Sequence, residues 1–219
     1  MSARGIVAVL VGVVVVGCLS RPYPERQRFV LQVERPGLPS VDAPPPGTSL
    51  AVAEGEVLRV GRVRVSPLFE RRRFVYRTAE GRFEEDFFHE FFVPPGTILQ
   101  RETRNWLAAS GLFPTVLRSG DPGAADWLLE ARVTELYGDR RAEPRAVLSI
   151  EFSLLDDRSG SLTPVLRRAY SEQVGVERGD PEGFQAGWGD ALARILAALE
   201  ADLRRELAVQ QTVSEEPAG

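Results

Sequence analysis

Cysteine, histidine and lysine are nearly missing from this sequence. It contains one cysteine, Cys18, and one histidine, His89, and all 27 of its basic residues are arginine. A single cysteine excludes a disulfide within the chain, and without a cluster of cysteine and histidine we expect neither a structural metal nor a cofactor. The missing lysine is explained more simply by genome base composition than by an arginine-specific ligand surface.

Catalytic motifs are also missing. A triad that uses histidine would have to include His89, which lies in a phenylalanine-rich segment, and the chain has no Gly-x-Ser-x-Gly sequence. The acidic residues 84–86 and the arginines 71–73 are expected to form charge pairs between strands rather than an acid-base pair. Gly183, Gly187 and Gly189 fall on a predicted helix rather than after a strand, which argues against nucleotide binding, and close helix packing at Gly183 and Gly187 is the simpler explanation. We therefore expect a protein that is not an enzyme.

A strong charge of either sign is missing too. The formal net charge is −4 and the sequence pI is about 5.3, which gives no electrostatic case for nucleic-acid binding. With 43% hydrophobic and 26% charged residues, the chain of 219 residues has a globular composition. Its length suits a single domain.

The amino terminus carries a short secretory signal. Arg4 supplies a positive end, and the apolar run Ile6–Val16 is shorter than the about 17–25 residues that span a bilayer. Gly17 then precedes Cys18, and a lone cysteine after a small residue resembles the lipobox of bacterial lipoproteins. We expect cleavage before Cys18 and acylation of this residue, including palmitate. An ordinary signal peptide and an uncleaved anchor are the alternatives.

The residues after the cysteine bear on its destination. Leu19 and Ser20 follow Cys18, and the lack of an aspartate there resembles lipoproteins that are sorted to the outer membrane. We therefore expect the mature chain to be lipid-anchored in the bacterial cell envelope, on the periplasmic side and at the outer membrane.

The composition changes along the chain and divides it into parts. Prolines crowd the segment 36–47 and predict an extended loop, whereas the polar carboxyl terminus predicts disorder. The expected parts are a signal peptide (1–17), a lipidated tether (18–28), a single domain that contains the proline-rich loop (29–208) and a disordered tail (209–219).

Short apolar segments bounded by Gly, Pro and Asp predict strands. Residues 83–93 also fit a helical stripe, but five phenylalanines in ten residues favour a strand that is buried on both faces. The expected strands are 29–33, 58–65, 74–76, 83–93, 113–117, 127–137, 146–155 and 165–176.

Two segments carry the signals of helices. In the first, Thr97 and Gln100 have the spacing of a capping box, and Gly111 is expected to end the helix. The second begins with Asp180 as N-cap and Pro181 in the first turn. Its apolar residues recur at helical spacing: Phe184, Trp188, Leu192, Ile195, Leu199 and Leu203.

The order of these elements is strands, one helix, strands and one helix. Such segregation predicts an α+β fold, in which two helices pack on one face of a largely antiparallel sheet.

Several segments, taken together, carry a family resemblance. They are Phe74–Arg77, Phe87–Pro95, Asn105–Phe113, Leu136–Asp139, Ala146–Leu148 and the terminal helix around Trp188. With the lipobox, they resemble the ABC-type transport auxiliary lipoproteins, the family that includes the lipoprotein of paraquat-inducible, MCE-type (mammalian cell entry) lipid transport systems. The likeness covers about residues 29–207. Phenylalanine stands at 87, 88 and 92, where the family leads us to expect tyrosine or tryptophan.

The resemblance implies a periplasmic, non-enzymatic accessory of a phospholipid transport machine. Its partners would be an MCE-domain protein and an ABC permease and ATPase, and relatives also form ring-like homo-oligomers. The competing function is a lipoprotein that binds phospholipid itself and shuttles it. This function needs an apolar pocket between sheet and helices, lined by Phe87, Phe91 and Trp106, which would otherwise fill the core. A hydrolase would need a nucleophile near His89.

Overall fold

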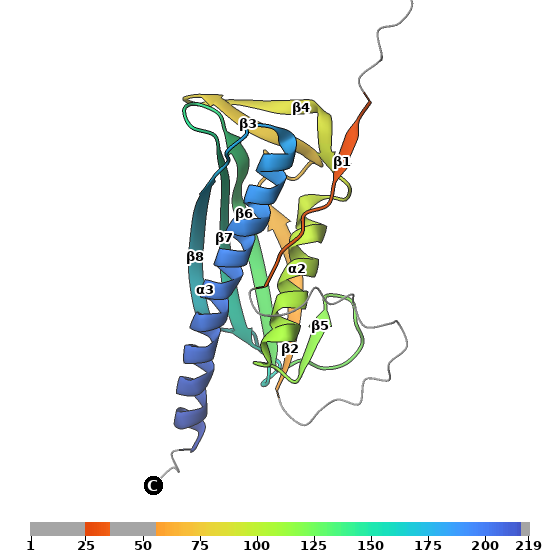
Figure 1. The fold of residues 1–219 in the computed structure, drawn as a ribbon. Helices are drawn as coiled ribbons and strands as arrows, with labels where there is room; N and C mark the ends of the chain where they lie inside the picture. Colours follow the sequence, from red (N-terminus) through yellow and green to blue (C-terminus); the bar gives the residue numbers. More distant parts are fainter. Residues whose placement is uncertain (1–24, 36–55, 216–219) are drawn as a thin grey trace, which may run out of the picture.

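The structure, a computed structural model, describes residues 25–35 and 56–215. In these ranges the chain forms one eight-stranded sheet with two long helices against one of its faces (Figure 1). Cys18 and the predicted proline-rich loop lie outside the described residues. The elements are β1 (Gln27–Phe29), β2 (Val57–Val65), β3 (Arg73–Ala79), β4 (Arg82–Phe91), α2 (Pro95–Ser110), β5 (Thr115–Arg118), β6 (Trp127–Asp139), β7 (Arg145–Asp156), β8 (Thr163–Gly175) and α3 (Pro181–Glu215).

β6 is the strand around which the sheet is built. β2 runs parallel to its first half, where Leu58 pairs with Trp127, and β3 runs parallel to its end, where Tyr76 pairs with Gly138. β7 pairs with β6 along its whole length on the other edge, and β8 follows outside β7. β2 and β3 therefore share one edge of β6, and residues 66–72 between them leave the sheet and return to it.

The predicted α+β class is confirmed, and both helices pack on one face, but the sheet is mixed. The pairings β1–β4, β2–β5, β2–β6 and β3–β6 are parallel. The pairings β3–β4, β6–β7 and β7–β8 are antiparallel, and the last two form the longest ladders. The sheet is thus not purely antiparallel, because β6 takes two parallel neighbours from the first half of the chain.

Alternation along β6 sets the two faces of the sheet. Trp127, Leu129 and Val133 are buried, whereas Glu130 and Arg132 are not. α2 lies against β2 and β5, and α3 lies against β7 and β8 (Figure 1). The apolar stripe predicted for the last helix is confirmed, since all its members are fully buried: Phe184, Trp188, Leu192, Ile195, Leu199 and Leu203.

The predicted ends of the helices are confirmed at two places. The side chain of Asp180 accepts the backbone N–H of Gly183 at 2.9 Å, as expected of an N-cap. Gly111 follows α2 with a φ of 70°, a left-handed conformation that glycine adopts without steric cost.

The predicted capping box at Thr97 is wrong. α2 begins at Pro95 after Pro94, and no side chain caps it. The Gln100 side chain instead donates to the carbonyl of Gly61 at 2.8 Å, where a register shift in the pairing of β2 with β6 interrupts the ladder. Contact with the sheet therefore determines the bonding of Gln100 more strongly than the local sequence does.

Two predicted boundaries differ at the ends of the domain. β1 ends at Phe29, so the strand expected over 29–33 is only one residue long in the sheet. Residues 30–35, which we call the strap, continue between α2 and α3 (Figure 1). α3 continues to Glu215, so the first part of the segment 209–219, predicted to be disordered, is helical.

The strap is held closely against α3. Gln185 donates its side-chain N–H to the carbonyl of Val30 at 2.9 Å, and Leu31 is buried. A Cβ atom on Gly189 would collide with the carbonyl oxygen of Gln32. Glycine at this position of α3 therefore allows the strap to lie directly on the helix backbone.

Candidate functional site

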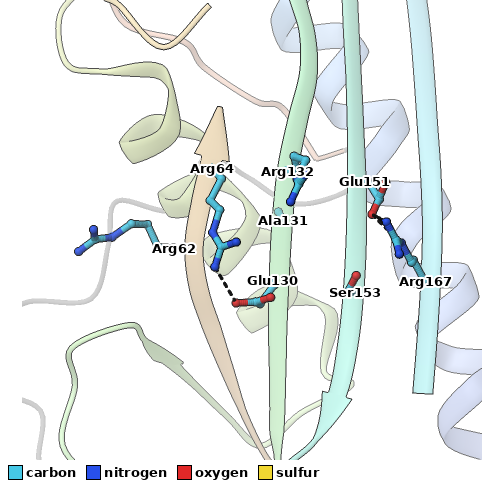
Figure 2. Close-up of a pocket in the computed structure, with 8 residues that line it drawn as sticks. All are labelled: Arg62, Arg64, Glu130, Ala131, Arg132, Glu151, Ser153 and Arg167. Atoms are coloured by element: carbon cyan, nitrogen blue, oxygen red, sulfur yellow. Dashed lines mark hydrogen bonds and ion pairs between the residues drawn. The ribbon is translucent and has the colours of Figure 1, made fainter. Parts of the chain in front are cut away.

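The face of the sheet opposite the helices is exposed and polar. Side chains two residues apart on a strand point to the same face, so each strand contributes alternate residues to this surface. They border a shallow groove that crosses four strands, with the helices on the far side (Figure 2). We call this surface the polar face, and its groove is lined by Arg62 and Arg64 of β2, Glu130, Ala131 and Arg132 of β6, Glu151 and Ser153 of β7, and Arg167 of β8.

Arginines outnumber carboxylates in this groove. Glu130 lies 3.7 Å from Arg64, and Glu151 lies 2.6 Å from Arg167. Arg62 and Arg132 form no ion pair with any residue that the structure describes. The Arg62 guanidinium extends away from the groove beyond β2 (Figure 2). Together with Arg132 it leaves the polar face positively charged, so a surface rich in carboxylates would complement this face.

The groove is also small. Its volume is about 200 Å³, below the about 300–1,000 Å³ of typical small-molecule pockets. Its lining is charged rather than apolar, which is unfavourable for an acyl chain. The polar face therefore suits a broad polar contact with another macromolecule better than the enclosure of a lipid.

β4 contains a bulge at residues 86–89, and hydrogen bonds to Asp86 stabilise it. The register of β3 with β4 sets residues 86–89 opposite Phe74 alone. One carboxylate oxygen of Asp86 accepts the backbone N–H groups of Phe88 at 2.8 Å and His89 at 3.0 Å, and the other lies 2.8 Å from His89 Nδ1. Burial alone would raise the pKa of Asp86, but these bonds to the charged form keep it below its ordinary value. His89 thus contacts a structural carboxylate.

The bulge turns an aromatic side chain towards solvent. Phe87 is 53% exposed, and Phe92 and Val30 are 54% and 47% exposed, so the strand predicted to be buried on both faces is wrong at 87 and 92. The guanidinium carbons of Arg26 and Arg73 lie 5.4 Å and 5.3 Å from the centroid of the Phe87 ring. We call Val30, Phe87 and Phe92 the aromatic patch.

The residues predicted to line a lipid pocket do not meet. Phe87 is exposed, whereas Phe91 is buried with its ring centroid 5.5 Å from that of Trp188. Trp106 lies between α2 and α3, where its indole N–H donates to Glu200 at 2.9 Å. These aromatics therefore belong to a surface, to the core and to a helix contact, and they do not line a common cavity.

Glu200 joins three parts of the fold. Its carboxylate accepts two bonds from Arg35 of the strap, at 3.0 Å and 2.8 Å, in addition to the bond from Trp106 of α2. Arg35 also donates to the backbone carbonyl of Trp106 at 2.9 Å. Sequence reasoning missed this network, although a glutamate next to Leu199, within the span of the apolar stripe of the last helix, was a usable signal.

The structure also bears on the predicted charge pairs between β3 and β4 and on the predicted close packing at Gly187. Glu85 lies 3.2 Å from Arg73 and 3.8 Å from Arg71, so the expected charge pairs between β3 and β4 are confirmed. A Cβ atom on Gly187 would lie 2.7 Å from the Cβ of Ala146, so close packing explains this glycine as expected.

Metal and membrane features can be assessed for the described ranges. Within residues 25–35 and 56–215, no group of three or more His, Cys, Asp or Glu side chains could hold a metal ion. None of the helices in those ranges is long and apolar enough to cross a membrane.

Together, a mixed sheet, helices on one face only and a charged opposite face define an α+β domain. The sequence model of the ABC-type transport auxiliary lipoprotein component family matches residues 37–199, and the chain belongs to this family. The predicted family is thereby confirmed. A lipoprotein component of a transport system belongs to the cell envelope.

Two solved structures share the fold. A protein from Xanthomonas campestris superposes with a TM-score of 0.61 at 16% identity, over 85% of this chain and 97% of that one. A second, uncharacterized protein gives a TM-score of 0.59 at 17% identity, over 84% and 99% of the two chains. At such identities the similarity shows the fold alone. No match was found among curated proteins.

Proposed function

We propose that this chain is a non-enzymatic subunit of an ABC/MCE-type system that moves phospholipid between membranes. Acylated Cys18 would anchor it to the periplasmic side of the outer membrane. Family membership supports the transport role, and the signal over 1–17 supports the anchor. The subunit acts by docking to the MCE-domain protein.

The polar face is the observation that carries this proposal. It is a broad surface without a helical cover, and Arg62 and Arg132 hold two positive charges without partners among the described residues. Such charges select a partner by complementarity and speed its association. An acidic surface on the MCE-domain protein is the complement we expect.

The packing of the core supports docking over lipid shuttling. Trp188 is fully buried, and its ring lies 4.9 Å from Phe74 and 5.5 Å from Phe91. Aromatic side chains thus occupy the space between sheet and helices in which an acyl chain would have to lie. The lipid anchor then serves to concentrate the subunit near its partner.

A binding experiment tests the docking surface. The lipoprotein and the MCE-domain protein of the same genome, both purified in detergent, are mixed and separated by size-exclusion chromatography with light scattering. We expect them to co-migrate and the double variant Arg62→Glu/Arg132→Glu to bind at least about tenfold more weakly, which corresponds to about 1.4 kcal/mol. Arg168→Glu is the control, because Arg168 is an exposed arginine of β8 next to Arg167 but on the opposite face of the strand.

Two results would contradict the proposal. If the proteins do not co-migrate at micromolar concentrations and the lipoprotein alone carries one tightly bound phospholipid, the shuttle function replaces docking. If Arg168→Glu weakens binding as much as the double variant, the polar face is not the docking surface.

A further inference from the structure

The aromatic patch lies at one end of the molecule. β1 and β4 form this end, while the carboxyl terminus of α3 lies at the other (Figure 1). The two ends are far apart, because the thirteen residues of β6 span about 40 Å at roughly 3.3 Å per residue. Leu162, which immediately precedes β8, lies at the far end, since Thr163 pairs with Asp156 and Asp156 pairs with Trp127 at the start of β6.

The amino-terminal tether enters the domain beside this patch. Gln27 pairs with His89, and Arg26 stands over the Phe87 ring. Nine peptide steps separate Cys18 from Gln27, so the acylated residue can lie at most about 30 Å from β1. An anchored domain can therefore bring the aromatic patch, at the end where the tether enters, into contact with the lipid surface.

The chemistry of the patch suits the interface of a bilayer. Phe92 and Val30 are neighbours, because the backbone N–H of Phe92 donates to the carbonyl of Phe29 at 2.8 Å. Exposed apolar side chains can enter the acyl boundary, while arginines keep their charge among the headgroups with their stems along apolar surface. Arg73 beside Phe87, and Arg72, which donates to the Phe92 carbonyl at 3.3 Å, are placed for this.

We infer that the aromatic patch is a membrane-contact surface, and that Phe87 and Phe92 enter the lipid layer into which the protein's own acyl chains insert. This inference rests on the proposed anchor at Cys18. The domain then stands on the membrane on its β1–β4 end, and the carboxyl-terminal end of α3 points away from the lipid. The polar face is left at the side, accessible to a protein partner.

Site-directed labelling tests this orientation. Acylation blocks the thiol of Cys18, so a new cysteine is the sole reactive thiol of the mature lipoprotein. Phe87→Cys and Phe92→Cys carry an environment-sensitive dye, and each protein is reconstituted into phosphatidylethanolamine/phosphatidylglycerol vesicles with and without brominated acyl chains. Leu162→Cys is the matched control, since Leu162 is 51% exposed and lies at the far end.

We expect brominated lipid to quench the dyes at 87 and 92 at least about threefold more than the dye at 162. Two sites are labelled so that the test still works if one variant does not fold. The unfolding curve of each variant is recorded to check its fold. Neutral phosphatidylcholine vesicles should give the same order of quenching, because Glu90 and Glu85 lie 3.8 Å and 3.2 Å from Arg72 and Arg73 and balance their charge. The aromatic rings then supply the contact with the lipid.

The outcomes separate this inference from the proposed anchor. If the wild type does not sediment with vesicles and its mass shows an unmodified Cys18, the anchor fails and the inference falls with it. If the protein sediments with vesicles but the dyes at 87 and 92 are quenched no more than the dye at 162, only the membrane contact is overturned. Protection of both dyes solely after addition of the MCE-domain protein would assign the patch to a protein and also overturn it.

Discussion

At the scale of single residues, two carboxylates hold regions that the backbone pattern alone would leave loose. Glu200 fastens the strap to both helices, and Asp86 fastens the bulge of β4. Each accepts several bonds from the same neighbourhood, so removal of either leaves more than one donor without its partner.

Glu200→Gln should destabilise the domain. Glutamine has the same size as glutamate, but it has only one side-chain oxygen and no negative charge. It therefore cannot accept both of the charge-assisted bonds that Arg35 donates. Because both side chains are partly exposed, we expect the free energy of unfolding to fall by about 1–2 kcal/mol rather than by the larger cost of breaking a fully buried pair. Urea unfolding followed by tryptophan fluorescence measures it.

Glu172→Gln is the control for this change. Glu172 lies 3.8 Å from Arg194, in an exposed pair that also involves α3. A change within about 0.5 kcal/mol is expected there. Equal effects of the two substitutions would mean that the Glu200 network contributes no more than a surface ion pair.

Asp86→Asn should change the pH dependence of stability. The pKa of Asp86 is lower in the folded than in the unfolded chain, so its charged form stabilises the fold above the ordinary Asp pKa of about 3.9. That stabilisation is lost as the pH falls through the lowered pKa. Asp86→Asn should therefore be less stable than wild type at pH 7, and the difference should shrink below about pH 4. Parallel unfolding curves from pH 3 to 7 measure it, and a constant difference would contradict the assignment.

At the scale of elements, the sequence predicted α3 far better than β4. The stripe from Phe184 to Leu203 is decided by spacing within one helix, and the structure buries every member of it. The bulge at 86–89 depends on hydrogen bonds from two backbone N–H groups to the Asp86 carboxylate, and the spacing of apolar residues does not predict such bonds. The pattern of the strap likewise matches a strand, but its hydrogen bonds to α2 and α3 take the segment out of the sheet.

Leu199→Ala measures the packing of α3. Leu199 is fully buried, so the substitution should cost about 2–5 kcal/mol through lost transfer free energy and the cavity that remains. Leu162→Ala removes an exposed leucine and should cost under about 0.5 kcal/mol. A small loss at both positions would mean that α3 is packed loosely against the sheet.

At the scale of the whole molecule, the family and the α+β class were predictable, whereas the neighbours of each strand were not. β2 and β3 share one edge of β6 because of long-range pairings, such as Leu58 with Trp127, and neither alternation nor turn residues specify these. The polar face was equally hidden. Arg62 and Arg132 belong to the same groove only because β2 and β6 lie side by side.

The predicted lipid anchor at Cys18 would determine where the whole molecule lies in the cell. Cys18→Ala should yield a chain without acyl groups that no longer partitions with membranes. Each buried CH₂ contributes about 0.8 kcal/mol, so several acyl chains anchor firmly where one would be marginal. Membrane fractionation and intact-mass measurement test this, and an unmodified cysteine in the mature wild type would contradict it.

The position of the strap between α2 and α3 affects the order in which the chain folds. Arg35 bonds to Glu200 across 165 residues of sequence, so the strap cannot form its contacts with α3 until the last helix is complete. Contacts between such distant segments form late and slowly. Because a chain is synthesised from its amino terminus, the strap at first has no α3 to pack against, and β2 has no β6 to pair with. During that interval the strands without partners expose unpaired edges, which can aggregate. A chaperone that binds unfolded chains would protect the protein until its last helix has been synthesised.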